Sequence, residues 1–315
     1  MSDAIHLGID VGGTASRWTA CSADGTVVAR GKANGATGHL FNPAEREKLR
    51  TALATIAAEM TTTGLSAATV STGLTGFGVG VADDLRLLLR EAFGVENGNI
   101  IVVDDMTLAY ASIFQPGQGH LISAGTGSIG LHIGEGDTYV RVGGRGVLID
   151  DAGSGTWIAL RALDHIFRRL DHTGSFDEVK LLSDELFTLV GGNDWHAVRQ
   201  YVYAGDRGRI GTLAVAVSKA AHAGDPAALS ILHDAGIELA RLAQALTERA
   251  GTKPIGFIGG VLALHPVLTE AITAALAGHE VIFPKADASL IAAQLHLPLG
   301  AHWHAVLTTN AGIAR

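Results

Sequence analysis

Two glycine-rich turns, a little over a hundred residues apart, constrain the fold of this chain more than any other feature. The first is DVGGT at Asp10–Thr14, and the second is SAGTGS at Ser123–Ser128. Each follows a short apolar run and precedes two strand-like segments joined by a turn. Glycine lets backbone N–H groups approach an anion without a Cβ in the way. The pair predicts a duplicated lobe, with a polyphosphate held between the two copies.

The pattern of apolar residues predicts two α/β lobes, and a chain of 315 residues suits two domains. Three strands come first, followed by helices that alternate with strands. This order predicts a mixed sheet that starts with antiparallel strands and is flanked by helices. We expect an N-terminal lobe over residues 1–113 and a C-terminal lobe over 114–315, with a helical insertion at about 156–250. The sequence leaves open which lobe the segment after Asp287 joins.

Composition excludes several classes of function. The net charge of −8 argues against nucleic acid as a main partner, because phosphate binding needs clustered Lys and Arg. No apolar run reaches the length of a membrane span, and the N-terminus lacks the basic flank of a signal peptide. The single cysteine, Cys21, excludes a disulfide within the chain and a cysteine-rich metal site. We therefore expect a cytoplasmic protein with no membrane partner, and a homodimer is possible.

Asp10 is the first candidate for chemistry, because it ends a buried strand just before two glycines. An unpaired carboxylate there is costly, and a hydrated Mg²⁺ would give it a partner. Alternatively, the aspartate caps its own turn. The second glycine turn favours the metal.

Asp104 and Asp105 follow the apolar strand Ile100–Val103. Side chains alternate along a strand, so only one of the two should face a cleft. Such a residue either caps the next helix or, at the carboxyl end of a strand, meets a ligand. A carboxylate there can accept a proton from a substrate hydroxyl, even with the usual aspartate pKa of about 4.

Two further glycine-rich segments are less specific. The glycines of Gly143–Gly155 let this loop pass close to a ligand, and Asp151 would then accept hydrogen bonds from sugar hydroxyls. The alternative, which is equally favoured, is that Asp151 or Ser154 caps the next helix. Gly259 and Gly260 follow a strand and would lie flat against a nucleotide base, although many strand–helix junctions need glycine.

Taken in order, these segments resemble the actin-like superfamily of sugar kinases and chaperone ATPases. The nearest likeness is to the BadF/BadG-type ATPase family that includes N-acetylglucosamine kinase. The run Gly143–Ile158, GGRGVLIDDAGSGTWI, is the most specific match. The resemblance implies two ribonuclease-H-like lobes around a central cleft, with ATP and Mg²⁺ as cofactors.

The resemblance also implies roles for particular residues. Asp10 would hold Mg²⁺ through water, and Asp105, rather than Asp104, matches the catalytic base. The phosphate contacts would come from Gly12, Gly13, Thr14, Gly125, Thr126 and Gly127. The adenosine contacts would come from Gly259 and Gly260. The sugar contacts would come from Asn34, Asp105, Ser128, Gly144, Arg145 and Asp151.

Departures from the family pattern affect the identity of the substrate. Arg145 stands where similar kinases often have Trp, and Ala152 ends a triplet that is usually Gly-Asp-Glu. The expected asparagine near residue 36 is displaced to Asn34. We expect ATP-dependent phosphorylation of an amino sugar, foremost N-acetylglucosamine at its 6-hydroxyl. The alternative acceptors are glucosamine and N-acetylmuramic acid. Arg145 would favour N-acetylmuramic acid, because that sugar has a carboxylate. Rival functions are an ATPase that activates a dehydratase, and a non-catalytic sugar or nucleotide sensor.

Overall fold

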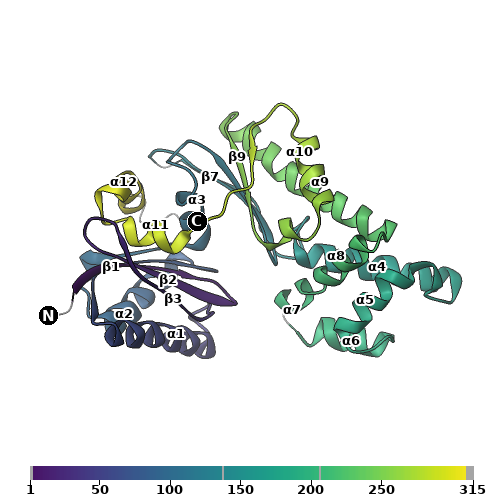
Figure 1. The fold of residues 1–315 in the computed structure, drawn as a ribbon, viewed down its shortest axis with the longest axis horizontal. Helices are drawn as coiled ribbons and strands as arrows, with labels where there is room; N and C mark the ends of the chain where they lie inside the picture. The colour runs from purple at the N-terminus through teal and green to yellow at the C-terminus, as the bar shows by residue number, and fades with distance from the viewer. Residues whose placement is uncertain (1–2, 137, 206, 310–315) are drawn as a thin grey trace. The chain divides into compact units, whose positions relative to one another are not determined.

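The chain forms two compact units in a computed structural model that describes residues 3–136, 138–205 and 207–309 (Figure 1). Unit 1 takes in the described residues up to Gln118, the short segment Ile133–Tyr139, and the described residues from Lys285 onward. Unit 2 consists of Gly119–His132 and Val140–Pro284. Unit 1 is therefore built from segments at both ends of the sequence.

The sheet of unit 1 has five strands in the order β3-β2-β1-β4-β5. The neighbours of β1 are β2, which is antiparallel, and β4, which is parallel. β2 and β3 are antiparallel, and β4 and β5 are parallel. The strands are β1 Asp3–Val11, β2 Ala15–Cys21, β3 Val27–Asn34, β4 Leu65–Leu74 and β5 Ile100–Asp104. The helices that follow these strands are α1 Pro43–Thr62, α2 Ala82–Phe93 and α3 Asp105–Ala111.

Helices α1 and α2 cover one face of this sheet (Figure 1). α1 starts where the Asn42 side chain accepts a hydrogen bond from the Ala44 N–H, with Pro43 in the first turn. Leu49, Leu53 and Ile56 recur at helical spacing and are fully buried in the core of unit 1. The cap and the proline thus set the start of α1, and the apolar face packs it into the core of unit 1.

The opposite face of the unit 1 sheet receives the end of the chain, in α11 (Ala288–Gln294) and α12 (Ala301–Thr309). Gly8 of β1 allows this approach, because a Cβ there would lie 2.1 Å from the Ser289 carbonyl oxygen. The hydroxyl groups of Thr19 and Ser289 are hydrogen-bonded at 2.7 Å. The sequence left the place of this segment open. The predicted C-terminal lobe ran to residue 315, whereas the described residues from Lys285 onward pack in unit 1.

The sheet of unit 2 also has five strands, in the order β10-β9-β6-β7-β8. Its strands are β6 His120–Ala124, β7 Ser128–Ile133, β8 Tyr139–Gly143, β9 Ile255–Ile258 and β10 Val281–Ile282. β6 pairs with β7 antiparallel and with β9 parallel, and β9 and β10 are parallel. If β6 is equated with β1, the order of the two sheets is the same, so the duplicated lobe is confirmed at the level of topology.

A helical stretch separates β8 from β9. It contains α4 Gly155–Thr173, α5 Lys180–Val190, α6 Trp195–Tyr203, α7 Arg207–Gly211, α8 Ala214–His222 and α9 Pro226–Ala250, and α10 Pro266–Ala275 follows β9. The longest helix, α9, begins where Asp225 accepts a hydrogen bond from the Ala228 N–H, and α9 packs against β6 and α10. Among the described residues, every helix is too short or too polar to cross a membrane.

Candidate active site

In unit 1, Asp10 lies near the carboxyl end of β1, where its cross-strand neighbours are Arg17 on β2 and Gly73 on β4. Burial raises the pKa of the Asp10 carboxyl, the charge of Arg17 opposes that change, and the charge of Asp287 adds to it. A half-buried carboxylate with a raised pKa gains from a nearby cation.

The first glycine turn follows Asp10 directly. The Gly12 N–H donates to the Ala15 carbonyl at 3.1 Å, and the Gly12 carbonyl accepts from Ala36 N–H at 3.1 Å. Nothing lies within 4 Å of the position where a Cβ would extend from Gly13. Thr14 is exposed. The turn is therefore held from both sides while its tip stays open, as an anion site requires.

Asn34 ends β3 beside this turn, and its side chain is exposed. A Cβ on the next residue, Gly35, would lie 2.4 Å from the Gly13 carbonyl oxygen, so the two backbones are in close contact. The expected position of a sugar contact at Asn34 is thus adjacent to the first glycine turn in unit 1.

Asp104 and Asp105 have different environments. Asp104 caps α3: its Oδ1 accepts from Thr107 N–H at 2.9 Å, and its Oδ2 accepts from the Thr107 hydroxyl at 2.5 Å. The Asp105 carboxylate accepts from Met106 N–H at 2.9 Å and from the Thr75 hydroxyl. The helix cap therefore belongs to Asp104, and Asp105 keeps acceptor capacity for another donor.

The pKa of the Asp105 carboxyl is raised from 3.8 to about 6. Burial is the largest cause, the charges of Asp104 and Asp10 add to it, and the hydrogen bonds from Thr75 and Met106 oppose it. The interaction of Asp105 with Asp10 brings the two predicted carboxylates into one region of unit 1. The usual aspartate pKa that the sequence analysis assumed is too low for this position.

The unit 1 residues fit a hydrated Mg²⁺. Among the described residues, no cluster of three or more His, Cys, Asp or Glu side chains is arranged to hold a metal ion. Mg²⁺ commonly binds through one or two carboxylates together with waters and substrate phosphates. Asp10, a half-buried carboxylate beside an open glycine turn, matches that arrangement and would be the residue that holds the ion.

In unit 2, the second glycine turn joins β6 to β7 and is fixed by the loop before α4. The Gly125 N–H donates to the Gly127 carbonyl, and the Gly125 carbonyl accepts from Gly155 N–H, both at 2.9 Å. Ser128 is buried, and its hydroxyl donates to the Ala152 carbonyl at 2.7 Å. The Ser128 hydroxyl therefore links the end of the turn to the loop before α4, while Thr126 at the tip of the turn is exposed.

Gly259 and Gly260 follow β9 at the same edge of the unit 2 sheet. Gly259 has a φ of +112°, and a Cβ there would lie 2.2 Å from the Ala124 carbonyl oxygen. Nothing lies within 4 Å of the corresponding position on Gly260. Only glycine allows the β9 end to pack this tightly beside the second glycine turn.

The loop from Gly143 to Gly155 places its predicted sugar contacts in contrasting environments. A Cβ on Gly144 would meet the side chain of Ile129 at 3.0 Å. The Arg145 side chain is 62% exposed, and its guanidinium lies 3.3 Å from Asp150. The Asp151 side chain is 1% exposed, and its backbone has a φ of +64°. Arg145 is therefore exposed, whereas the Asp151 side chain is buried beside Gly127 of the second glycine turn.

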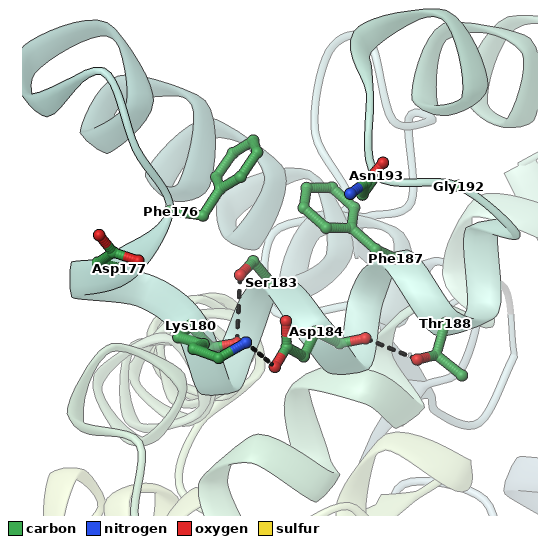
Figure 2. A pocket seen from close by; sticks show the side chains of 9 residues that line it. All are labelled: Phe176, Asp177, Lys180, Ser183, Asp184, Phe187, Thr188, Gly192 and Asn193. Carbon is green, nitrogen blue, oxygen red and sulfur yellow. Dashed lines mark hydrogen bonds and ion pairs between the residues drawn. The ribbon is translucent and has the colours of Figure 1, made fainter.

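A pocket of about 660 Å³ lies elsewhere in unit 2, in the helical stretch (Figure 2). Phe176 and Phe187 line it, and their rings meet edge to face with centroids 5.0 Å apart. Lys180 is paired with Asp184 at 2.8 Å, as Figure 2 shows. None of the residues that line this pocket is a predicted site residue.

Two residues that contact the site were missed by the sequence analysis. Thr75 follows β4, and the rule that ligands gather at the carboxyl ends of parallel strands gives a reason to select it. Arg207 lies 3.8 Å from the Asp151 carboxylate, although the two residues are far apart in the sequence. Nothing in the local sequence around Arg207 indicates this contact.

Two lobes with the same strand order, each with a glycine turn after its first strand, define an actin-like fold of the kind found in sugar kinases. Residues 7–291 match the model of the BadF/BadG/BcrA/BcrD ATPase family. The chain belongs to this family, as the resemblance implied.

A curated relative is the N-acetylmuramic acid/N-acetylglucosamine kinase of Clostridium acetobutylicum, which is 29% identical over 153 residues. That match covers 48% of this chain and 49% of the relative, so it spans about half the length of each. Among solved structures, a candidate N-acetylglucosamine kinase from Chromobacterium violaceum is 25% identical, with a TM-score of 0.69, over 91% of this chain and 98% of that one. A glucokinase from Streptomyces griseus in complex with glucose and AMPPNP has the same fold, at 17% identity and a TM-score of 0.54, over 92% of this chain and 97% of that one.

Proposed function

We propose that this protein is an ATP-dependent kinase that phosphorylates a hydroxyl group of an amino sugar, foremost the 6-hydroxyl of N-acetylglucosamine. The observation that carries the proposal is the environment of Asp105: a half-buried carboxylate with a pKa of about 6, in electrostatic contact with Asp10 in unit 1. A base with this pKa is largely ionised at neutral pH and is better matched to an alcohol proton than an ordinary aspartate is.

In the proposed reaction, Asp105 orients the acceptor hydroxyl and takes its proton. The hydroxyl oxygen bonds to the γ-phosphorus of ATP while the bond to the β-phosphate oxygen breaks, and ADP leaves. Phosphoryl transfer of this kind depends on positioning and on stabilising negative charge. N–H groups at the exposed tips of the two glycine turns, Gly12–Thr14 and Gly125–Gly127, would serve that purpose. Mg²⁺, held through Asp10, would supply further positive charge at the phosphate oxygens.

N-acetylmuramic acid is the alternative acceptor, and Arg145 is the observation that favours it. The Arg145 side chain is mostly exposed, and its guanidinium forms an ion pair with Asp150 at 3.3 Å. An exposed ion pair of this kind is weak, so the carboxylate of a substrate can compete for the guanidinium. The Clostridium acetobutylicum relative is named for both sugars. Glucosamine is the remaining amino-sugar acceptor that the sequence analysis left open.

Two rival functions are disfavoured by the residues of this chain. An ATPase that activates a dehydratase needs an iron–sulfur cluster, normally held by four cysteine thiolates, and the one cysteine here, Cys21, is buried. A non-catalytic sensor of sugar or nucleotide has no need of a base such as Asp105.

The test is a coupled assay of ADP release with Mg-ATP and, separately, N-acetylglucosamine, glucosamine, N-acetylmuramic acid and glucose, followed by mass measurement of the products. We expect ADP release that requires an amino sugar, with a product heavier by one phosphate group. Release that is the same with and without every sugar would instead indicate an uncoupled ATPase. Iron analysis of anaerobically purified protein tests the activator function.

The same panel tests the role of Arg145. We expect Arg145→Ala to raise the KM for N-acetylmuramic acid by about tenfold and to leave the KM for N-acetylglucosamine nearly unchanged, because only the first sugar has a carboxylate. Equal effects on the two sugars would remove Arg145 from substrate selection.

A further inference from the structure

Asp151 is a buried carboxylate in an unusual backbone conformation. It is the only residue other than glycine with a positive φ in the described part of the chain. Its side chain is 1% exposed, and its Oδ2 is buried without a hydrogen-bond partner among the described residues. A non-glycine residue held at positive φ carries strain that the surrounding structure must maintain.

The Asp151 carboxylate lies against the second glycine turn. A Cβ built on Gly127 would be 3.0 Å from Asp151 Oδ2 and 3.3 Å from Oδ1. The neighbouring loop is fixed in turn, because Ser154 N–H donates to the Asp151 carbonyl at 3.1 Å and Ser128 donates to Ala152. A charged group enclosed in this way needs a cation to offset its loss of hydration.

Arg207, the first residue of α7, supplies that cation. Its guanidinium lies 3.8 Å from Asp151 Oδ2, and its own side chain is 59% exposed. This separation is longer than a hydrogen bond, so the contact is electrostatic and leaves the carboxylate oxygen available as an acceptor. Asp150 lies beside Asp151 in sequence, but its carboxylate is paired with Arg145 at 3.3 Å.

The backbone of Arg207 is tied to the same turn. Thr156 Oγ1 lies 2.8 Å from the Thr126 carbonyl oxygen and 3.1 Å from the Arg207 carbonyl oxygen, and its hydroxyl is the donor to both. A Cβ on Gly211, at the other end of α7, would be 3.3 Å from Thr156 Oγ1. The start of α7 is thus anchored next to the glycine turn through both its main chain and its side chain.

We propose that Arg207 is a positioning residue for the phosphoryl-transfer site: it holds the Asp151 carboxylate in place beside the second glycine turn, where Asp151 would accept a hydrogen bond from the hydroxyl of a bound sugar. This inference rests on the proposed sugar kinase function. It assigns a role in sugar binding to a residue of the helical stretch that lies far from the glycine turn in sequence.

The first experiment measures the pair without any substrate, by thermal unfolding at pH 7.5 of wild type, Arg207→Ala, Asp151→Asn and the double variant. Arg207→Ala leaves a buried carboxylate without its cation, so we expect the melting temperature to fall by about 3 °C. In the Asp151→Asn background the same change should have almost no effect. Equal losses in both backgrounds would show that the two side chains are not coupled and would overturn the proposal.

The second experiment measures kinetics on the same variants. We expect Arg207→Ala to raise the KM for the sugar about tenfold and to change kcat and ADP affinity by less than about twofold. Arg207→Lys keeps the charge and should recover most of the sugar affinity. Arg209→Ala, on the same helix, is the charge-matched control, because the Arg209 guanidinium packs over the Tyr201 ring instead.

The outcomes separate the two proposals. If wild-type protein shows no sugar-dependent ADP release, the kinase function fails, and the unfolding cycle still decides whether Arg207 and Asp151 form a coupled pair. If wild type is active and Arg207→Ala weakens ADP binding rather than sugar binding, the positioning role is wrong.

Discussion

At the scale of single residues, two adjacent aspartates show how local bonding divides structural and chemical roles. Both carboxylate oxygens of Asp104 accept hydrogen bonds from Thr107, one from its N–H and one from its hydroxyl, so Asp104 is the cap of the helix. Asp105 accepts from the Met106 N–H and the Thr75 hydroxyl, lies close to two other carboxylates, and has a pKa of about 6. The same helix start therefore places a structural residue and the proposed base side by side.

Asp105→Asn should separate catalysis from stability. The amide keeps an acceptor for Met106 N–H but takes up no proton, so we expect kcat to fall at least about a hundredfold while ADP affinity is retained. A folded-state pKa of about 6, against 3.8, corresponds to a cost of ionisation of about 3 kcal/mol. That cost develops as the pH rises from about 4 to 6 and is complete above 6.

The variant should accordingly be more stable than wild type at pH 7.5, and this gain should shrink at pH 5 as the wild-type carboxyl becomes protonated. Urea unfolding at both pH values measures the difference, with kcat determined on the same preparations. A variant with nearly normal kcat would exclude Asp105 as the base.

Thr75 gives a second prediction, on pH dependence. Because the base must be ionised, kcat/KM of wild type should decline as the pH falls below about 6. The Thr75 hydroxyl lowers the pKa of Asp105 through its hydrogen bond, so Thr75→Ala should move this decline to higher pH. Thr75→Ser retains the hydroxyl and should restore the wild-type profile. Identical profiles for all three proteins would contradict the role of this hydrogen bond.

At the scale of secondary structure elements, the packing of α11 on β1 depends on the missing side chain of Gly8. A methyl group there would lie 2.1 Å from the Ser289 carbonyl oxygen and 2.2 Å from the Ala293 nitrogen. Both atoms belong to the backbone and cannot move aside without displacing the helix. We therefore expect Gly8→Ala to destabilise the protein by about 3 kcal/mol.

Gly98→Ala is the matched control for this prediction, because nothing lies within 4 Å of the added methyl group. Chemical unfolding of the two variants and wild type provides the measurement. If Gly8→Ala were as stable as Gly98→Ala, α11 would not be packed on β1 as described.

Much of the element order was predictable from sequence, and the reasons are local. Asn42 with Pro43, and Asp225 with Pro226, mark helix starts through caps and a favoured proline position, and both helices begin there. The second glycine turn revealed the repeat of the three-strand pattern. The position of α11 was not predictable, because it depends on a contact between residues 8 and 289, at opposite ends of the chain.

The candidate site was predictable to a different degree. The glycines at Gly12 and Gly13 indicate a turn whose backbone is open to an anion. The structure has an exposed tip there, held by backbone hydrogen bonds at Gly12. The buried state of Asp151 and its contact with Arg207 were not predictable, because they result from tertiary packing of α7 against the turn. The raised pKa of Asp105 has the same origin, since burial is its largest cause.

At the scale of the whole molecule, the two largest hydrophobic cores among the described residues follow the division into units. Leu53 is buried in the core of unit 1, and Leu239 is buried in the core of unit 2. Each core is closed by helices that pack on its own sheet. We therefore expect the two units to lose stability independently.

Leu53→Ala and Leu239→Ala test this independence, and each should cost about 2–5 kcal/mol because each leaves a cavity among buried side chains. Hydrogen exchange under native conditions measures where the cost appears. Leu53→Ala should speed exchange in β1, β4 and β5 and leave β6, β7 and β9 protected, and Leu239→Ala should do the reverse. If either variant lowered protection equally in both sheets, the protein would unfold as one cooperative body. In that case a single substitution in the helical stretch would also weaken the strand that positions Asp10, and effects on activity could not be assigned to one unit alone.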